Sequence, residues 1–144
     1  MNASAYGETS GSDTRESRPM MEPLMVFSLR DEIEALRSES PWNERDRNSR
    51  MLAKEVDFRV LLTVLRAGAR LDEQDGDARA SMQLLEGRAV LRLAGGSNAG
   101  GDEEAELDPG DVATVDAGRP WELEARTDCA LLLTLAWPRE KAGV

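Results

Sequence analysis

The residues most suggestive of chemistry lie between two glycines, in the stretch GARLDEQDGDARASMQLLEG at 68–87. A glycine, an acidic turn and a strand-like run to a second glycine are typical of a metal-binding segment. The stretch nevertheless contains no histidine or cysteine, and Gln74, Gly76 and Ala80 stand where histidines might be sought. Transition metals prefer imidazole, thiolate or carboxylate ligands, and of these three residues only Gln74 offers a weak neutral oxygen. The stretch therefore predicts the turns of a metal site without its ligands.

Few other groups in the chain could carry out catalysis. There is no histidine, and the single cysteine, Cys129, lies in the apolar run DCALLLTLAW, where we expect a buried and inert thiol. The only tyrosine is Tyr6, near the N-terminus. Carboxylate catalysis needs an acid that faces the interior, and strand alternation turns Glu122 and Glu124 outward. We assign no catalytic residue and disfavour an enzyme, without excluding one.

The composition limits the partners of the protein. The 144 residues are enough for one domain, and 28 acidic against 18 basic residues give a formal net charge of −10. That charge opposes binding to nucleic acid and to anionic membranes. No run approaches the roughly 18 apolar residues of a membrane span, and the N-terminus does not read as a secretory signal. We expect a cytoplasmic protein.

A short helix precedes the main domain. Residues 1–22 are polar and predict a disordered tail. In SLRDEIEALRSES, Ser28 predicts an N-cap that Asp31 answers in the manner of a capping box, and Pro41 ends the helix. The apolar residues at helical spacing are Leu29, Ile33 and Leu36. Residues 23–49 are thus read as a helix and a polar connector, with Trp42 packed on the body.

Strand patterns follow from residue 50 to residue 138. Six or seven short apolar runs separated by turns favour an all-β sandwich or barrel, and 139–144 form a C-terminal tail. Two runs around Gly87 read as a hairpin. The runs RVLLTVL at 59–65 and ALLLTLAW at 130–137 are apolar on both faces, which suggests a homodimer interface.

The glycine spacing from 68 to 125 resembles that of the cupin family. Its first motif, G-x5-H-x-H-x3-4-E-x6-G, aligns Gly68 and Gly87 with the two glycines, and Gln74, Gly76 and Ala80 with the three ligands. Its second motif is G-x5-P-x-G-x2-H-x3-N. There Gly110 and Gly118 match the glycines, whereas Asp116, Trp121 and Ala125 replace proline, histidine and asparagine.

The resemblance implies a small jelly-roll β-barrel with its turn glycines kept and its metal ligands absent. The vacated positions are Gln74, Gly76, Ala80 and Trp121, so we expect no metal cofactor. Glu73, Asp75 and Asp77 form either a solvated acidic loop or a calcium-like oxygen site. A metal-dependent cupin enzyme with atypical ligands is a separate alternative.

Alternation predicts an apolar barrel interior in place of the metal. The candidate pocket residues are Gln74 at the rim and Met82, Leu84, Trp121 and Leu123 inside. Either these side chains fill the barrel, the simpler outcome, or a cavity remains for a small apolar or aromatic ligand. The sequence thus predicts a metal-free, non-catalytic binding or structural module, with a sensor of a small hydrophobic molecule as the alternative.

Overall fold

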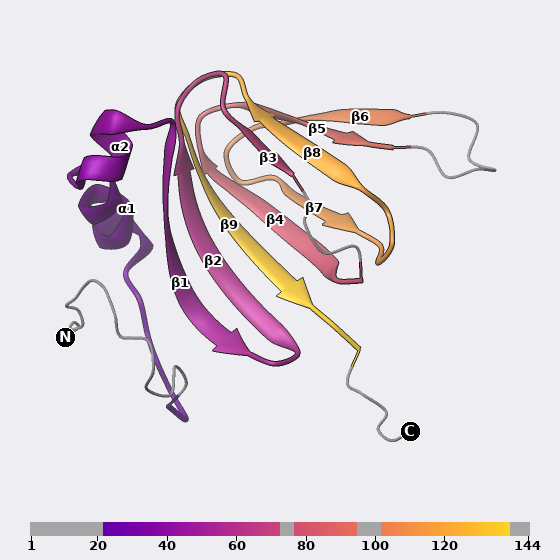
Figure 1. Ribbon diagram of the computed structural model, residues 1–144, viewed down its shortest axis with the longest axis horizontal. Helices are drawn as coiled ribbons and strands as arrows, with labels where there is room; N and C mark the ends of the chain where they lie inside the picture. The colour runs from indigo at the N-terminus through magenta and orange to yellow at the C-terminus, as the bar shows by residue number, and fades with distance from the viewer. Residues whose placement is uncertain (1–21, 73–76, 95–101, 139–144) are drawn as a thin grey trace.

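The computed structural model describes residues 22–72, 77–94 and 102–138. Strands dominate this part of the chain, and they form two antiparallel sheets (Figure 1). The five-stranded sheet has the order β1-β2-β9-β4-β7, and the four-stranded sheet has the order β3-β8-β5-β6. The elements are α1 (Leu29–Arg37), α2 (Ser40–Glu44), β1 (Arg47–Glu55), β2 (Phe58–Leu65), β3 (Arg70–Asp72), β4 (Arg79–Glu86), β5 (Ala89–Leu93), β6 (Glu103–Leu107), β7 (Val112–Val115), β8 (Trp121–Ala125) and β9 (Cys129–Ala136).

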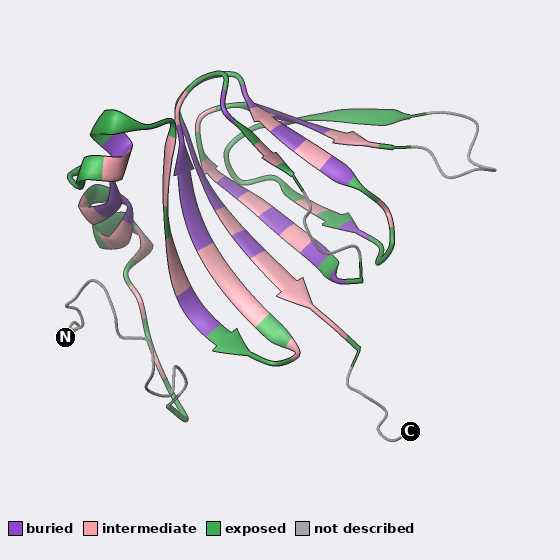
Figure 2. Ribbon diagram, in the orientation of Figure 1, coloured by how far each residue is buried: buried purple, intermediate pink, exposed green. Residues whose placement is uncertain are grey.

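The inner faces of the two sheets enclose one apolar core. Burial alternates along the strands, most clearly on β4 and β8, as it does when one face of a strand packs inward (Figure 2). The fully buried members of this core include Leu65, Met82, Leu84, Leu123 and Leu131. The all-β jelly-roll barrel expected from the sequence is confirmed.

The hairpin expected around Gly87 is wrong. Strand β4 pairs with β7 and β9, whereas β5 pairs with β6 and β8 in the other sheet. Gly87 has a φ of 87°, which suits a sheet-to-sheet corner as well as a hairpin turn. The corner is held by Thr127, whose Oγ1 accepts a hydrogen bond from the Arg88 backbone N–H at 3.0 Å.

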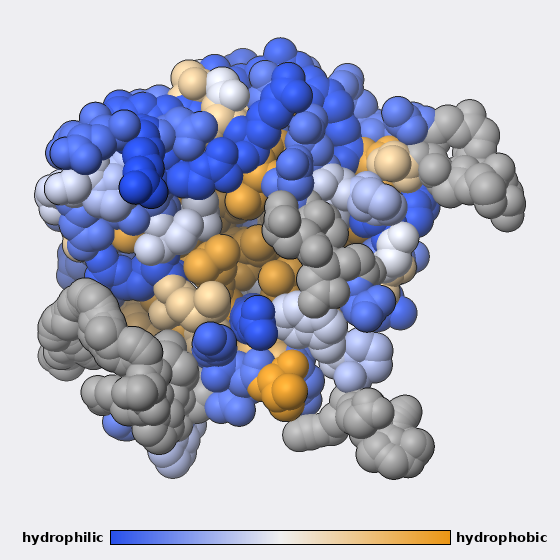
Figure 3. All heavy atoms as spheres, in the orientation of Figure 1, coloured by the Kyte–Doolittle hydropathy of each residue, from blue (hydrophilic) through white to orange (hydrophobic). Residues whose placement is uncertain are grey.

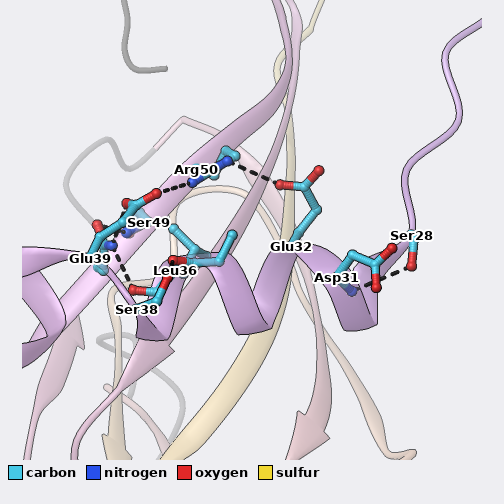
Figure 4. Close-up of polar contacts among 10 residues, drawn as sticks. Ser28, Asp31, Glu32, Leu36, Ser38, Glu39, Ser49 and Arg50 are labelled. Carbon is cyan, nitrogen blue, oxygen red and sulfur yellow. Dashed lines mark hydrogen bonds and ion pairs between the residues drawn. The ribbon is translucent and has the colours of Figure 1, made fainter. Parts of the chain in front are cut away.

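The polar stretch before residue 50 is more ordered than the sequence indicated. Helix α1 ends at Arg37, before Pro41, and Pro41 instead lies in the first turn of α2, where its missing N–H costs nothing. Strand β1 then begins at Arg47. Its polar start is explained by Arg50, which bridges Glu32 of α1 and Glu39 at 3.2 and 2.7 Å (Figure 4).

The two helices cover part of the outer face of the five-stranded sheet. The Ser28 hydroxyl accepts a hydrogen bond from the Asp31 N–H at 3.3 Å, which confirms the predicted N-cap (Figure 4). The expected packing role of Trp42 is also confirmed: it is 6% exposed and lies under the Arg66 guanidinium, 4.0 Å from the ring centre. This second apolar cluster comprises Ile33, Leu36, Trp42, Leu52, Leu62, Val64 and Ala130. Apolar residues on the outer faces of β2 and β9 are thus covered in part by the chain itself.

Candidate functional site

Two of the four vacated ligand positions lie inside the barrel. Ala80 on β4 and Trp121 on β8 come from opposite sheets, are each 5% exposed and belong to the same apolar core. The other two positions, Gln74 and Gly76, fall outside the described residues. Neither Ala80 nor Trp121 offers a lone pair suited to a divalent ion.

The remaining candidate pocket residues surround this pair. Met82, Leu84 and Leu123 are fully buried in the core that holds Ala80 and Trp121. The structure therefore brings four of the five predicted pocket residues into one apolar interior.

We call the closed end of the barrel the end at which the chain passes from one sheet to the other between β2 and β3 and between β4 and β5. The Gly68 N–H donates to the Ala125 carbonyl at 2.7 Å, and the Ala125 N–H donates to the Ala69 carbonyl at 2.9 Å. Nearby, the Cys129 thiol is buried and donates to the Arg88 carbonyl at 3.0 Å. Burial raises the pKa of this thiol, so Cys129 is neutral and unsuited to nucleophilic attack.

At the other end the sheets diverge, as Figure 1 shows. Three inward apolar side chains at this end, Leu61, Leu93 and Leu135, pack against the core and remain partly exposed. Hydrophobic residues gather at the centre of the face in Figure 3, between hydrophilic borders. We call this end, defined by Leu61, Leu93 and Leu135, the open mouth.

A basic side chain lies at the open mouth, and the sequence reasoning missed it. Arg59 is two residues before Leu61 on β2 and pairs with Leu135 on β9, so it shares the inward face of both. Its guanidinium lies 4.9 Å from the ring centre of Trp137. Its Nε is buried and has no hydrogen-bond partner among the described residues. Counting alternate residues back from Leu61 would have placed Arg59 inward.

The acidic residues of β8 face away from the interior. Glu122 and Glu124 bind Arg92 at 3.2 and 2.9 Å on the outer face of the four-stranded sheet. The hydrogen bond from Arg92 holds the pKa of Glu124 below its usual value. Within the described ranges, no three His, Cys, Asp or Glu side chains converge as metal ligands. The described residues at the site therefore do not fit the metal that the cupin motifs would bind.

The fold matches solved structures, although the sequence does not match known families. No protein-family model and no curated protein matches the chain. A conserved protein of unknown function from Streptococcus pyogenes is 20% identical over 83% of this chain and 92% of its own, with a TM-score of 0.59. A cupin superfamily protein from Desulfitobacterium hafniense is 20% identical over 65% of this chain and 80% of its own, with a TM-score of 0.57. Lactobacillus farciminis oxalate decarboxylase is 18% identical over 67% of this chain and 30% of its own, with a TM-score of 0.57.

These likenesses establish the fold, and the fold is shared by enzymes and by proteins of unknown function. In the described part of the chain, neither helix is long and apolar enough to cross a membrane. The two antiparallel sheets, the turn glycines at the motif positions and the solved neighbours agree: the chain has the cupin fold.

Proposed function

We propose that this protein is a metal-free cupin-type binding module whose barrel accepts a small apolar molecule through the open mouth. The observation that carries the proposal is the apolar interior, in which Ala80 and Trp121 occupy ligand positions and offer no metal-binding atom. Ligand pockets are mostly apolar, with a few placed polar groups. The partly exposed Leu61, Leu93 and Leu135 supply an apolar entrance.

The same residues support a non-catalytic role. Glu122 and Glu124 lie on the outer face and form ion pairs with Arg92 and Arg70, so they do not reach a ligand inside the barrel. The Cys129 thiol is buried at the closed end. The described interior thus supplies binding surface without a general acid or base.

Two measurements test this proposal. Elemental analysis of the purified full chain should find well under one transition metal per chain. Calorimetric titration with 1-octanol, an uncharged apolar probe, should give saturable binding of one molecule per chain. A stoichiometric metal, or no saturable octanol binding, contradicts the proposal.

A matched pair of variants locates the octanol. An apolar groove of about 450 Å³ lies on the outer face, between residues 22–29 and the sheet, and Leu24 lines it. Leu135→Asn at the open mouth should weaken octanol binding, and Leu24→Asn should leave it unchanged. The opposite pattern would place the probe in the outer groove. Thermal unfolding of both variants checks that they fold.

We also propose that the protein is a homodimer that pairs through this outer face. Leu24 and Val26 are 78% and 80% exposed beside the apolar groove, so one surface offers both protruding side chains and a receiving groove. A two-fold interface needs such self-complementarity. Light scattering should give twice the chain mass, and the double variant Leu24→Asp, Val26→Asp should give the mass of one chain. A monomeric wild type contradicts this proposal.

A further inference from the structure

We propose that the molecule bound in the barrel is an amphipathic monocarboxylate, held by its carboxylate on Arg59 with its apolar body between the sheets. This inference rests on the proposed binding function and adds the class of ligand. It depends on the position of Arg59, on the lack of a carboxylate partner for it among the described residues, and on the second cation beside it.

The position of Arg59 suits a ligand that enters the barrel. Its cross-strand partner, Leu135, packs against the core, and Leu61 follows two residues later on the same face of β2. Arg59 is half-buried, with its guanidinium 4.9 Å from the ring centre of Trp137. An aromatic ring beside a guanidinium attracts its charge without occupying its N–H groups, which stay available to an anion.

Arg59 has no carboxylate partner in the described part of the chain, in contrast to the half-buried Arg37 and Arg92. Arg37 lies 2.7 Å from Glu86, and Arg92 lies 2.9 Å from Glu124. No described Asp or Glu comes within 4.0 Å of Arg59, and its buried Nε lacks a hydrogen bond. A partly desolvated charge without a counterion is unfavourable, and a bound anion would relieve it.

A second cation lies directly beside the first. Lys54 on β1 is the cross-strand partner of Arg59, so the two side chains share one face of the sheet. Like charges placed opposite each other on neighbouring strands repel. Two adjacent cations, neither paired with a described carboxylate, are unexpected in a chain with a net charge of −10. An anion held at the open mouth would turn this repulsion into attraction.

The chemistry of the site favours a carboxylate. A planar guanidinium matches the two oxygens of a carboxylate in a bidentate pair. A dianionic phosphate would be repelled more strongly by the acidic chain than a monoanion would be. The apolar surface behind Arg59, formed by Leu61, Leu133 and Leu135, then suits a hydrocarbon body.

Four probes with the same alkyl chain test the inference: octanoate, 1-octanol, octylamine and octyl phosphate. Calorimetry on the full chain should show octanoate binding at least tenfold more tightly than each of the others, since hydrogen bonds to charged groups contribute more than neutral ones. Arg59→Gln should remove about this advantage and leave octanol binding unchanged. Lys54→Gln should lower octanoate affinity by a smaller factor. Arg70→Gln, which changes an exposed arginine on the outer face of β3, is the matched control and should have no effect.

The outcomes separate this inference from the proposed function. Equal binding of octanol and octanoate, unaffected by Arg59→Gln, overturns the carboxylate assignment and leaves the apolar site standing. Tightest binding of octyl phosphate replaces the carboxylate by a phosphate ligand, and tightest binding of octylamine overturns the role of both cations. Absence of binding by all four overturns the proposed function itself. If Arg59→Gln does not fold, the ranking of the four probes on the wild type still decides.

Discussion

Replacement of Gly87 by alanine should destabilise the barrel more than replacement of Gly68 or Gly110. Gly68, Gly87 and Gly110 have φ values of 89°, 87° and 96°, so alanine is strained at all three positions. At Gly68 and Gly110 an added Cβ would meet nothing within 4 Å. At Gly87 it would collide with the Asp128 carbonyl oxygen and lie 2.9 Å from Thr127 Oγ1. Alanine would thus be strained by the positive φ at all three positions, but only at Gly87 would its Cβ also collide with neighbouring atoms.

The magnitudes follow from these two terms. Left-handed backbone costs a non-glycine residue about 1–2 kcal/mol. Alanine also has less conformational freedom than glycine in the unfolded chain, which offsets about 0.4–1 kcal/mol of that cost. Gly68→Ala and Gly110→Ala should therefore each lose about 1 kcal/mol of unfolding free energy. Overpacking against backbone adds about 1–3 kcal/mol at Gly87, because Thr127 is itself held by the Arg88 N–H and cannot move freely.

Urea unfolding followed by circular dichroism measures all three variants. Gly87→Ala should lie about 2 kcal/mol below the other two in unfolding free energy, with an unchanged m-value. Equal losses at the three positions would refute the assignment of Gly87 to a crowded corner between the sheets. A loss at Gly68 or Gly110 larger than that at Gly87 would refute it equally.

Three further predictions concern single groups. The buried Cys129 should resist alkylation at pH 8 and react once urea unfolds the chain, and rapid alkylation of the folded chain would contradict this. Because the pKa of this thiol is raised in the folded state, the free energy of unfolding should fall as the pH rises above the pKa of an unfolded thiol. Ser28→Ala should cost about 1 kcal/mol by removing the cap on the Asp31 N–H, whereas Ser28→Asp should retain most of the stability in the same urea assay. Arg92 lowers the pKa of Glu124, so the wild type should have a larger unfolding free energy than Glu124→Gln above about pH 4.3. This difference should disappear as acid protonates the folded carboxylate, and a difference that does not change with pH would contradict the prediction.

The features predicted from the sequence are those that a local pattern determines. Alternation placed Ala80, Met82 and Trp121 inward correctly, because a half-buried strand repeats every two residues. The Ser28 cap was likewise predictable, since it depends only on residues three positions apart. These successes concern neighbours in the chain.

The features that were missed depend on distant partners. Gly87 has the same local geometry in a hairpin and in a corner between sheets, and only the pairing of β4 with β9 distinguishes them. Strand β1 begins with polar residues because Arg50 contacts acids on the helical segment. Arg59 belongs to no sequence motif. Its place at the open mouth depends on its cross-strand pairing with Leu135, which lies 76 positions away in the chain and is not encoded locally.

A crystal structure of the full chain grown with octanoate would show where the barrel binds this ligand. We expect an alkyl chain between the two sheets, its carboxylate on the Arg59 guanidinium, and no cation between Ala80 and Trp121. A cation bound between those two residues would contradict this expectation, as would octanoate seated only in the outer groove beside Leu24.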